Sequence, residues 1–479
     1  MSNRVRPVTA MEPDPRRQRA ILAVCCISLL LVSMDATIVN VALPSVQRDL
    51  HASVSGLQWT VDAYTLVLAS LLILSGSAAD RFGRRRVFRS GLCLFTLGSL
   101  LCSVAPSLDC LIAFRMIQAV GGSMLNPVAL SIIANTFTVP RERAWAIGVW
   151  GGVAGVSFAV GPVLGGVLVS SVGWRSIFWI NVPVGVAAMI LAGRIIPESR
   201  APRPRRPDWG AQFLILTFLA SLTYAIIAAP ADGWSSGTVV ALVAVSLLAA
   251  TALLVLESRR REPLIDLRFF RSAPFTGATF TAVAAFFALG GFLFLNTLYL
   301  QNVRGYSAAH AGLLTVPMAA AMGLAAPLSG RLVANRGPRL PLMLAAPALA
   351  LGASLLIGLN LHTPLLRLLV GYILFGAGFG LVNAPISNAA VSGMPRAQAG
   401  VAGAVASTSR QIGATLGVAV TGSIAAVASG STVDPTSALA WILIAACGLS
   451  VLVPAIVSTG PWATGTAERT RALFASDWP

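Results

Sequence analysis

The stretch GSAADRFGRRR, from Gly76 to Arg86, stands between two long apolar segments, residues 57–79 and 87–106. Each segment is long enough to cross a bilayer, for which about 20 residues of α-helix suffice. The aspartate and four arginines of the stretch therefore fall where two membrane helices would meet water. The same alternation of apolar segments and short Arg-rich loops continues along most of the chain, which predicts a membrane protein.

The composition supports this interpretation. The chain has 479 residues, of which 56% are hydrophobic and 11% are charged. Soluble domains carry about 45–50% apolar and about 25% charged residues. Only helices and closed barrels satisfy their backbone hydrogen bonds in lipid, and the sequence does not show the alternating strands of about ten residues that a barrel requires. We therefore expect an all-α membrane protein.

Fourteen apolar segments qualify as spans of about 20 residues or more. We place them at 19–45, 57–79, 87–106, 108–136, 143–171, 176–196, 209–229, 236–257, 274–301, 308–333, 339–361, 364–390, 398–428 and 437–458. Arginines are concentrated in every second loop, including Arg16, Arg81, Arg141, Arg200, Arg259, Arg336, Arg396 and Arg469. Such loops face the cytoplasm. Because fourteen is an even number, we expect both termini to be cytoplasmic.

The net charge of +17 raises the alternative of a nucleic-acid-binding protein. The basic residues are all arginine and lie in short clusters between spans, where topology explains them. We therefore expect the lipid bilayer as a partner, and no nucleic acid. Exclusive use of arginine fits a GC-rich bacterial genome and hence the bacterial inner membrane. The six cysteines lack metal-ligand spacing, so we expect no metal site.

A weak internal repeat indicates how the chain is divided. The stretch Gly330–Arg339 has the spacing of Gly76–Arg86, with a glycine, six residues, a second glycine and an arginine soon after. Many secondary transporters consist of two similar halves with the substrate between them. We expect a cytoplasmic tail, a six-helix bundle, a linker region with two extra spans (about 209–229 and 236–257), a second six-helix bundle and a second tail, at residues 1–18, 19–196, 197–273, 274–458 and 459–479.

The stretch around Asp80 resembles the loop signature of the major facilitator superfamily. The resemblance implies two six-helix bundles plus two extra helices, and a cytoplasmic charge latch at Gly76, Asp80, Arg81, Gly83 and Arg84. Ion pairs at a helix junction can favour one conformation and break in another. The alternative is that the arginines serve topology alone. The second copy departs from the pattern, because Ala334 stands where the acid would be.

Further motifs resemble those of the fourteen-helix drug:proton antiporters of this superfamily. They are Met34–Pro44 (MDATIVNVALP), Gly161–Gly166 (GPVLGG), Gly173–Arg175 with Phe178 and Asn181–Pro183, and Ser409–Gly413 (SRQIG). For the second motif the resemblance implies an antiporter signature that keeps the two halves sealed during export; its residues are Gly161, Pro162, Gly165 and Gly166. The alternative is ordinary packing of small residues. The fourth-span signature departs from the family at Ala119, usually a glycine, but keeps Arg115.

Ionisable residues inside spans are costly and mark functional sites. They are Asp35, Asp62, Arg115 and Arg410. A helical rise of about 1.5 Å per residue places Asp35 and Arg115 both about 20 Å from the cytoplasmic edge, so the two can meet. A carboxyl group in a partly dry site can hold a proton near neutral pH. We expect Asp35 to carry the proton, Arg115 to tune it and Asp62 to assist.

The expected substrate cavity draws its polar groups from Asp35, Asn40, Asp62, Tyr64, Gln118 and Arg410. Alternatives are that Asp35 braces polar helix contacts, that Asp62 reaches the headgroups, and that Arg410 is structural. The spans from Pro274 to Val457 hold no acid, so the second half is expected to supply an apolar wall. The aromatic residues of this wall include Phe286, Phe287, Phe292, Phe294 and Tyr299. The alternative is that these residues pack between helices or face lipid.

These inferences predict a monomeric, proton-coupled antiporter that exports lipophilic, cationic drugs or antibiotics by alternating access. A carboxylate that holds either a proton or a cationic substrate would make the two binding events exclusive. An exporter of an endogenous metabolite and a proton-coupled importer are the alternatives. An enzyme would need clustered nucleophiles, bases or metal ligands, and the three histidines are far apart in sequence. We expect no enzymatic activity and no cofactor, with the proton as coupling ion.

Overall fold

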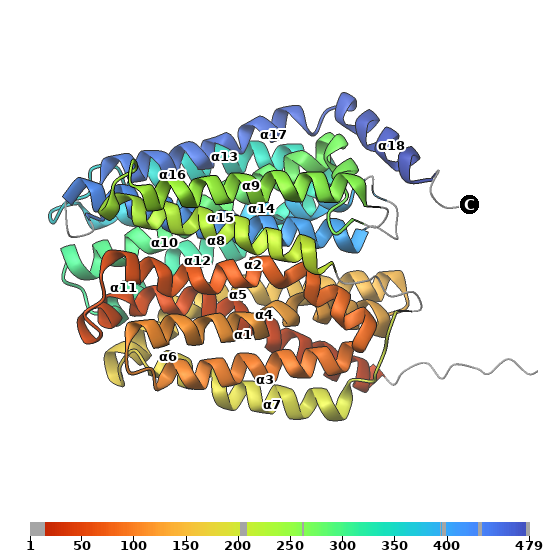
Figure 1. Cartoon of the computed structure of the whole chain (residues 1–479), viewed down its shortest axis with the longest axis horizontal. Coiled ribbons are helices and arrows are strands. Elements are labelled where there is room, and N and C mark those ends of the chain that lie inside the picture. The colour runs from red at the N-terminus through yellow and green to blue at the C-terminus, as the bar shows by residue number, and fades with distance from the viewer. Residues whose placement is uncertain are drawn as a thin grey trace, which may run out of the picture.

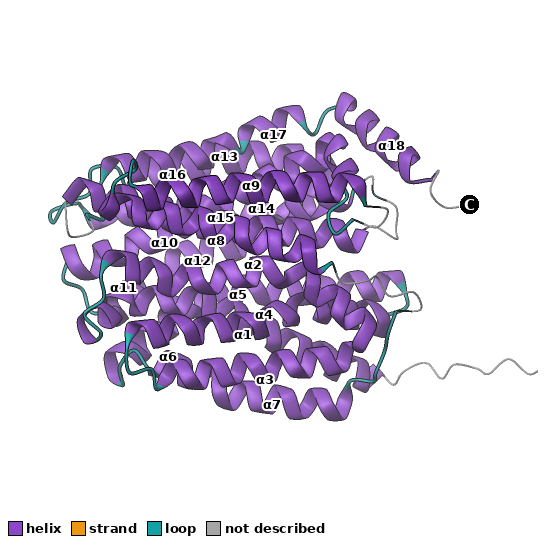
Figure 2. Cartoon of the chain, viewed as in Figure 1, coloured by secondary structure: helices purple, strands orange, loops and turns teal. Residues whose placement is uncertain are grey.

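The computed structural model describes residues 15–201, 208–260, 263–392, 394, 399–429 and 434–475. Within these ranges the chain forms helices joined by loops and turns, with no strand (Figure 2). The predicted all-α architecture is thereby confirmed. Parts of both predicted tails and of the first linker, as well as Arg396, lie outside the described residues.

The first half of the chain forms a bundle of long helices that run side by side (Figure 1). Its helices are α1 (Pro15–Asp49), α2 (Val54–Phe82), α3 (Arg84–Ser103), α4 (Leu108–Thr136), α5 (Pro140–Ser171), the short α6 (Ser176–Trp179) and α7 (Asn181–Ile195). Helix α1 packs against α4, α5 and α7. It therefore has protein on several sides, and its side chains can serve different contacts on different faces.

Two further helices, α8 (Trp209–Asp232) and α9 (Gly237–Arg259), coincide with the two extra spans expected in the linker region. Helix α8 packs on α2 of the first half and on α15 (Ala399–Ser429) of the second half. Helix α9 packs mainly on α8 and has few buried residues. The pair is thus attached to the rest of the protein through α8.

The second half begins after the short 3-10 helix η1 (Leu267–Arg271), where Phe269 is buried. The second half contains α10 (Ala273–Leu298), the π-helical η2 (Tyr299–Val303), α11 (Ala308–Leu314), α12 (Val316–Arg336), α13 (Arg339–Ser354), α14 (Leu365–Val391), α15, α16 (Ala438–Ser450), α17 (Leu452–Val457) and α18 (Pro461–Ala475).

Side chains at the helix termini fix where several helices begin and end. Ser53 and Ser107 cap α2 and α4 by accepting bonds from free backbone N–H groups of the first turn. Asp208 does the same for α8. Gly83, between α2 and α3, has a φ of 109°, which glycine adopts without the strain that other residues suffer. The chain therefore reverses direction at the GSAADRFGRRR stretch within a single residue.

Eleven of the described helical segments are long and apolar enough to cross a membrane. Helices α3, α13 and α15 run alongside them (Figure 1). Helix α1 begins, and α18 lies, at the same end of the bundle (Figure 1). The chain is a multi-pass membrane protein; the count of fourteen spans and the cytoplasmic side of both termini stay predictions.

Candidate functional site

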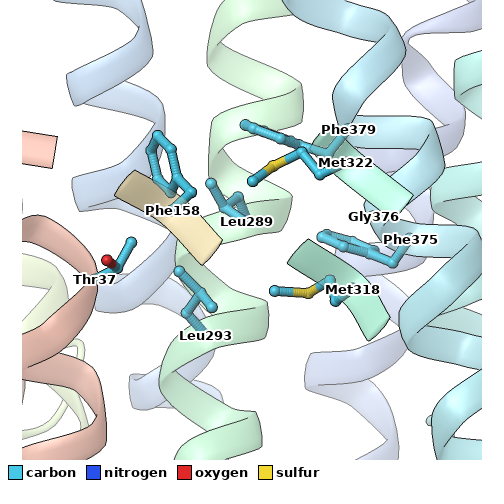
Figure 3. Close-up of a pocket in the computed structure, with 9 residues that line it drawn as sticks. All are labelled: Thr37, Phe158, Leu289, Leu293, Met318, Met322, Phe375, Gly376 and Phe379. Carbon is cyan, nitrogen blue, oxygen red and sulfur yellow. The ribbon is translucent and has the colours of Figure 1, made fainter. Parts of the chain in front are cut away.

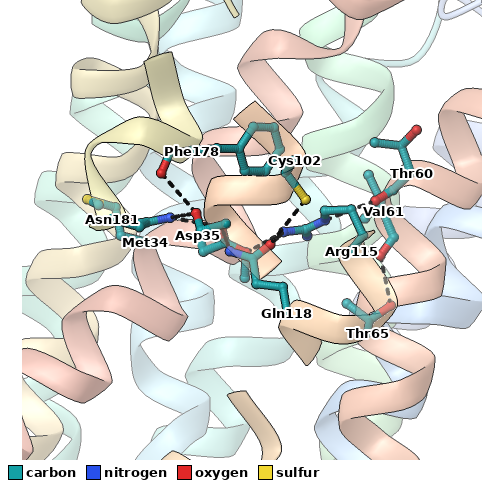
Figure 4. Close-up of polar contacts among 12 residues, drawn as sticks. Met34, Asp35, Thr60, Val61, Thr65, Cys102, Arg115, Gln118, Phe178 and Asn181 are labelled. Atoms are coloured by element: carbon teal, nitrogen blue, oxygen red, sulfur yellow. Dashed lines mark hydrogen bonds and ion pairs between the residues drawn. The ribbon is translucent and has the colours of Figure 1, made fainter. Parts of the chain in front are cut away.

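Asp35 lies in the interior of the first bundle, on α1, and is fully buried. Its Oδ2 atom accepts a hydrogen bond of 2.5 Å from Nη1 of Arg115, which α4 provides (Figure 4). The Arg115 side chain is 1% exposed. Because two charges lose their hydration in such a place, the pair is stable only if further hydrogen bonds satisfy the remaining polar atoms.

The second carboxylate oxygen of Asp35 is satisfied by two amides. Gln118 Nε2 donates to Oδ1 over 2.8 Å, and Asn181 Nδ2 donates to the same atom over 3.3 Å. Asn181, the first residue of α7, also donates to Ser99 Oγ of α3 over 3.1 Å. Helices α1, α4, α7 and α3 therefore meet in one hydrogen-bonded network that surrounds an ionised carboxylate with donors.

Arg115 is held on all sides as well. Its Nε donates to the backbone oxygen of Thr60 in α2 over 3.3 Å, and its Nη1 also donates to Gln118 Oε1 over 2.8 Å. Its guanidinium carbon lies 4.1 Å from the ring centre of Tyr64. An aromatic face attracts a cation most strongly where water is absent. The network thus fixes the position of the arginine as well as that of the acid.

The expected meeting of Asp35 and Arg115 is confirmed by this contact. Gln118 and Tyr64, which we expected in the substrate cavity, lie in the network instead. Sequence reasoning missed Asn181 and Ser99 as partners of this site. The signal for Asn181 was present, since a polar residue stands in the middle of an apolar run, within a motif that we had only matched to a family.

Asp62 is buried too, but the structure does not bring it into the network. Neither of its carboxylate oxygens has a hydrogen-bond partner among the described residues. Its neighbours on the same face of α2, Gln58 and Thr65, contact Ala419 and Thr415 of α15. Asp62 therefore lies at the contact between α2 and α15, where the two halves meet.

A narrow apolar cavity lies between the halves (Figure 3). None of the described residues that line it is charged. They come from α1, α5, α10, α12 and α14, and they are Thr37, Phe158, Leu289, Leu293, Met318, Met322, Phe375, Gly376 and Phe379. The second half supplies seven of them, so its wall is apolar as expected, although the aromatic residues at the cavity differ from those we named.

The cavity and the charged network lie on different faces of α1. Asp35 and Thr37 are two residues apart, which rotates their side chains by roughly 200° about a helix axis. Asp35 points to α4 and α7, whereas Thr37 lines the cavity (Figures 3 and 4). Helix α1 is therefore the shared wall between the buried acid and the space between the halves.

Two other predicted cavity residues also lie elsewhere. Asn40 is buried and donates to the backbone oxygen of Ala36 in its own helix over 3.2 Å. Arg410 donates to Ser387 Oγ of α14 over 2.7 Å, which matches the structural alternative that we considered for it. None of the six residues expected at the substrate cavity lines the cavity shown in Figure 3; their assignment to substrate stays a prediction.

The expected latch residues do contain an ion pair. Arg84 Nη2 lies 2.8 Å from Asp80 Oδ1, whereas the guanidinium carbon of Arg81 lies 5.7 Å from the ring centre of Phe82. Sequence reasoning missed a third participant, Glu198 of the linker. Its Oε1 accepts from the backbone N–H of Arg85 over 3.1 Å. The linker that leaves the first half is therefore fastened to the loop between α2 and α3.

The predicted antiporter signature packs tightly on both halves. A methyl group added to Gly161 or Gly165 would overlap the side chain of Thr37 or Ile38 in α1. A methyl group on Gly166 would come within 2.5 Å of the backbone oxygen of Ala308 in α11. The glycines thus permit close approach of α5 to α1 and to α11. The sealing role of this motif stays a prediction.

The sequence comparisons agree with this fold. Residues 25–418 match the Major Facilitator Superfamily. The chain therefore belongs to this superfamily of membrane transporters. Its relatives are transporters, and it is not an enzyme.

Three relatives carry names that refer to drugs or antibiotics. Multidrug resistance protein Stp of Mycobacterium tuberculosis is 37% identical over 420 residues, covering 88% of this chain and 78% of that protein. The tetracenomycin C resistance and export protein of Streptomyces glaucescens is 36% identical, with 84% and 74% covered. Puromycin resistance protein pur8 of Streptomyces alboniger is 37% identical, with 85% and 82% covered.

Solved structures support the fold alone. A D-xylose–proton symporter superposes with a TM-score of 0.68 at 14% identity, covering 93% of this chain and 99% of that one. The human organic anion transporter MFSD10 gives a TM-score of 0.63 at 16% identity, with 91% and 99% covered.

Proposed function

We propose that this chain is a proton-coupled antiporter that exports lipophilic drugs or antibiotics, cationic ones among them, across a bacterial inner membrane. The names of its relatives support export of such compounds. The observation that carries the proposal is the ion pair of Asp35 and Arg115, sealed behind the helix whose other face lines the cavity. We place both termini in the cytoplasm and take the monomer as the transporting unit.

The network would couple proton binding to movement of α1. In the described conformation, Arg115 and two amides hold Asp35 as a carboxylate. A proton on Asp35 removes the charge with which Arg115 pairs, so α1 loses its strongest bonds to α4 and α7. Helix α1 can then shift, and Thr37 moves with it at the cavity wall. Proton and substrate would thus exclude one another through α1 rather than by competing for one carboxylate.

The cavity indicates the substrate class. Phe158, Phe375 and Phe379 present aromatic surfaces, which bind apolar groups and attract cations. Met318 and Met322 supply flexible thioethers that adapt to different shapes. Thr37 is the one lining residue with a hydroxyl group. This lining favours a lipophilic compound over a polar metabolite such as a sugar, which needs several hydrogen-bond partners.

The test is drug-dependent proton movement in proteoliposomes with an imposed pH gradient, using ethidium as the lipophilic cation. We expect the wild type to dissipate the gradient when ethidium is added, and Asp35→Asn to reduce this response to background. The matched control is Asp49→Asn, because Asp49 lies at the end of the same helix in an exposed pair with Arg175. Such pairs contribute little, so this variant should respond as the wild type does.

A full response from Asp35→Asn would contradict the proposed coupling. Ethidium uptake by the wild type without any proton movement would also contradict it, and would leave a drug exporter driven by another gradient. If no lipophilic drug in a panel were transported or caused proton movement, and a metabolite were transported instead, the alternative of a metabolite transporter would replace the proposal.

A further inference from the structure

The contact between α2 and α15 is the place where the extra helix α8 touches both halves. At one end of α8 the ring of Tyr224 lies 5.6 Å from that of Trp59 in α2. At the other end Gln212 Nε2 donates to the backbone oxygen of Ser70, also in α2. On the side of the second half, Ser423 Oγ of α15 donates to the backbone oxygen of Ile226 in α8 over 2.8 Å.

One group of hydrogen bonds joins all three helices. Gln58 Nε2 of α2 donates to the backbone oxygen of Ala419 over 2.8 Å and lies 3.5 Å from Ser423 Oγ. Ser423 in turn donates to the backbone oxygen of Ile226 in α8. Gly422 gives the amide its space, because a methyl group there would come within 2.6 Å of Gln58 Nε2. We call Gln58, Gly422, Ser423 and Ile226 the three-helix node.

Asp62 lies one helical turn from this node, on the same face of α2. The next contact along that face is the hydrogen bond of 2.7 Å between Thr415 and Thr65. Asp62 therefore sits between two inter-half bonds, fully buried, with neither carboxylate oxygen bonded to any described residue. An ionised carboxylate without partners is very costly to bury, so this position suits a neutral carboxyl group while the helices remain closed.

The charged and titratable groups on the neighbouring helices are occupied with other partners. Arg115 of α4 pairs with Asp35 of α1. Arg410 of α15 donates to Ser387. Tyr224 of α8 lies beside Trp59, and Cys102 of α3 lies against Gln118. Among the described residues no ion pair or hydrogen bond reaches the carboxylate of Asp62, so access to it depends on separation of the helices around it.

We propose that Gln58 and Ser423 are positioning residues that hold α15 and α8 closed over Asp62, so that opening of the three-helix node admits water and protons to this acid. The inference rests on the proposed proton coupling, together with the prediction from sequence that Asp62 assists it, and it gives α8 a role in the transport cycle. The halves of such transporters rock against each other. Helix α8, bonded to both, must release one of them before α2 and α15 can part.

The experiment measures how readily the carboxyl group of Asp62 is reached. Purified protein in proteoliposomes is treated with a lipophilic carbodiimide, which modifies protonated carboxyl groups in apolar surroundings. Cleavage after Arg48 and Arg81 places Asp35 and Asp62 on different peptides. The peptide of Asp62 also contains Asp49 and Asp80, so fragmentation in the mass spectrometer assigns the modification to Asp62. One neutral hydrogen bond shifts an open–closed equilibrium by about two- to tenfold. We expect Ser423→Ala to raise modification at Asp62 by that factor, and Ser423→Thr, which keeps the hydroxyl, to restore the wild-type rate.

Ser246→Ala is the matched control. Ser246 Oγ of α9 donates to the backbone oxygen of Phe218 in α8 over 3.3 Å, so the change removes the same kind of bond without touching either half. We expect wild-type modification at Asp62 in this variant. Equal rates for the two alanine variants would overturn the proposal, as would a parallel rise at Asp35, which would indicate general loosening of the bundle.

Gln58→Leu provides a second, independent variant, because Gln58 reaches the node from the opposite side. We expect it to raise modification at Asp62 as Ser423→Ala does, and a wild-type rate would contradict its positioning role. The measurement needs neither drug nor transport. Failure of the proposed antiport would appear in the proton assay of the wild type, whereas failure of this inference would appear only in the pattern of modification.

Discussion

The two halves place buried polar contacts at corresponding helices but build them from different chemistry. In the first half, α1 and α4 bring together Asp35 and Arg115. In the second half, the first and fourth long helices, α10 and α14, bring together Asn296 and Tyr372, whose hydroxyl donates to Asn296 Oδ1. All four side chains are buried. One contact consists of two charges and the other of two neutral groups.

The side chains around the two contacts also differ in polarity. Polar side chains from several helices surround Asp35, whereas aromatic rings surround the neutral pair. Phe292 stacks on Phe375 with ring centres 4.3 Å apart, and Trp441 meets Phe292 edge to face. A proton can change the bonding of the first contact but has little to act on in the second. The comparison teaches that two halves with a similar fold differ in whether a proton can change the bonding of their buried polar contact.

The largest expected effect comes from breaking the charged contact. Arg115→Met leaves Asp35 buried without its counter-charge, and loss of one partner of a buried ion pair costs about 3–5 kcal/mol. We expect a large drop in thermal stability of the purified protein and loss of drug-dependent proton movement. The measurement is the unfolding temperature in detergent, beside transport in proteoliposomes.

The double variant Asp35→Asn, Arg115→Met sharpens this prediction. It removes both charges, so the unfolding temperature should recover part of the loss, while proton-coupled transport should stay absent. An unfolding temperature of Arg115→Met close to that of the wild type would show that the pair does not hold the first half together.

An intermediate effect is expected from the neutral contact. Tyr372→Phe removes the hydroxyl that bonds to Asn296 but keeps the ring among its aromatic neighbours. A lost neutral hydrogen bond costs about 0.5–1.5 kcal/mol, somewhat more if the acceptor is left unsatisfied. We expect a modest fall in unfolding temperature with proton coupling retained. Loss of drug-dependent proton movement in this variant would contradict the division of roles between the halves.

The sequence was sufficient for the class of fold and for the central ion pair. Apolar spans and Arg-rich loops predicted a helical membrane protein, and the rise of a helix placed Asp35 and Arg115 at the same depth. Depth is a property of one helix and can be computed from its sequence. The direction in which a side chain points depends on how the helices are rotated against one another, which the spacing alone did not provide.

The difference between depth and side-chain direction explains why some residues lie elsewhere than we predicted. Asp62 is buried in α2, but it faces α15 instead of the network around Asp35. Gln118 and Tyr64 turn toward Arg115 instead of the cavity. Glu198 was missed because a charge in a Pro/Arg-rich linker has no periodic signal that shows what it will contact.

The smallest expected effect concerns the loops, where the halves differ in the same way. The first copy of the repeat has the ion pair of Asp80 and Arg84, whereas the second has Ala334 at the position of the acid. The Asp80 side chain is 37% exposed, and pairs open to solvent contribute about 0–1 kcal/mol. We therefore expect Asp80→Asn to change the unfolding temperature little, although a latch of this strength can still bias an equilibrium between two conformations.

Transport measurements distinguish a conformational latch at Asp80 and Arg84 from arginines that serve topology alone. If the pair is a latch, Asp80→Asn should alter the rate of drug-dependent proton movement several-fold while stability stays near that of the wild type, because about 1 kcal/mol corresponds to roughly fivefold in an equilibrium. Ala334→Asp is the matched variant, since it adds an acid to the second copy. Unchanged transport in Asp80→Asn would mean that the arginines of GSAADRFGRRR serve topology alone, which is the alternative that the sequence left open.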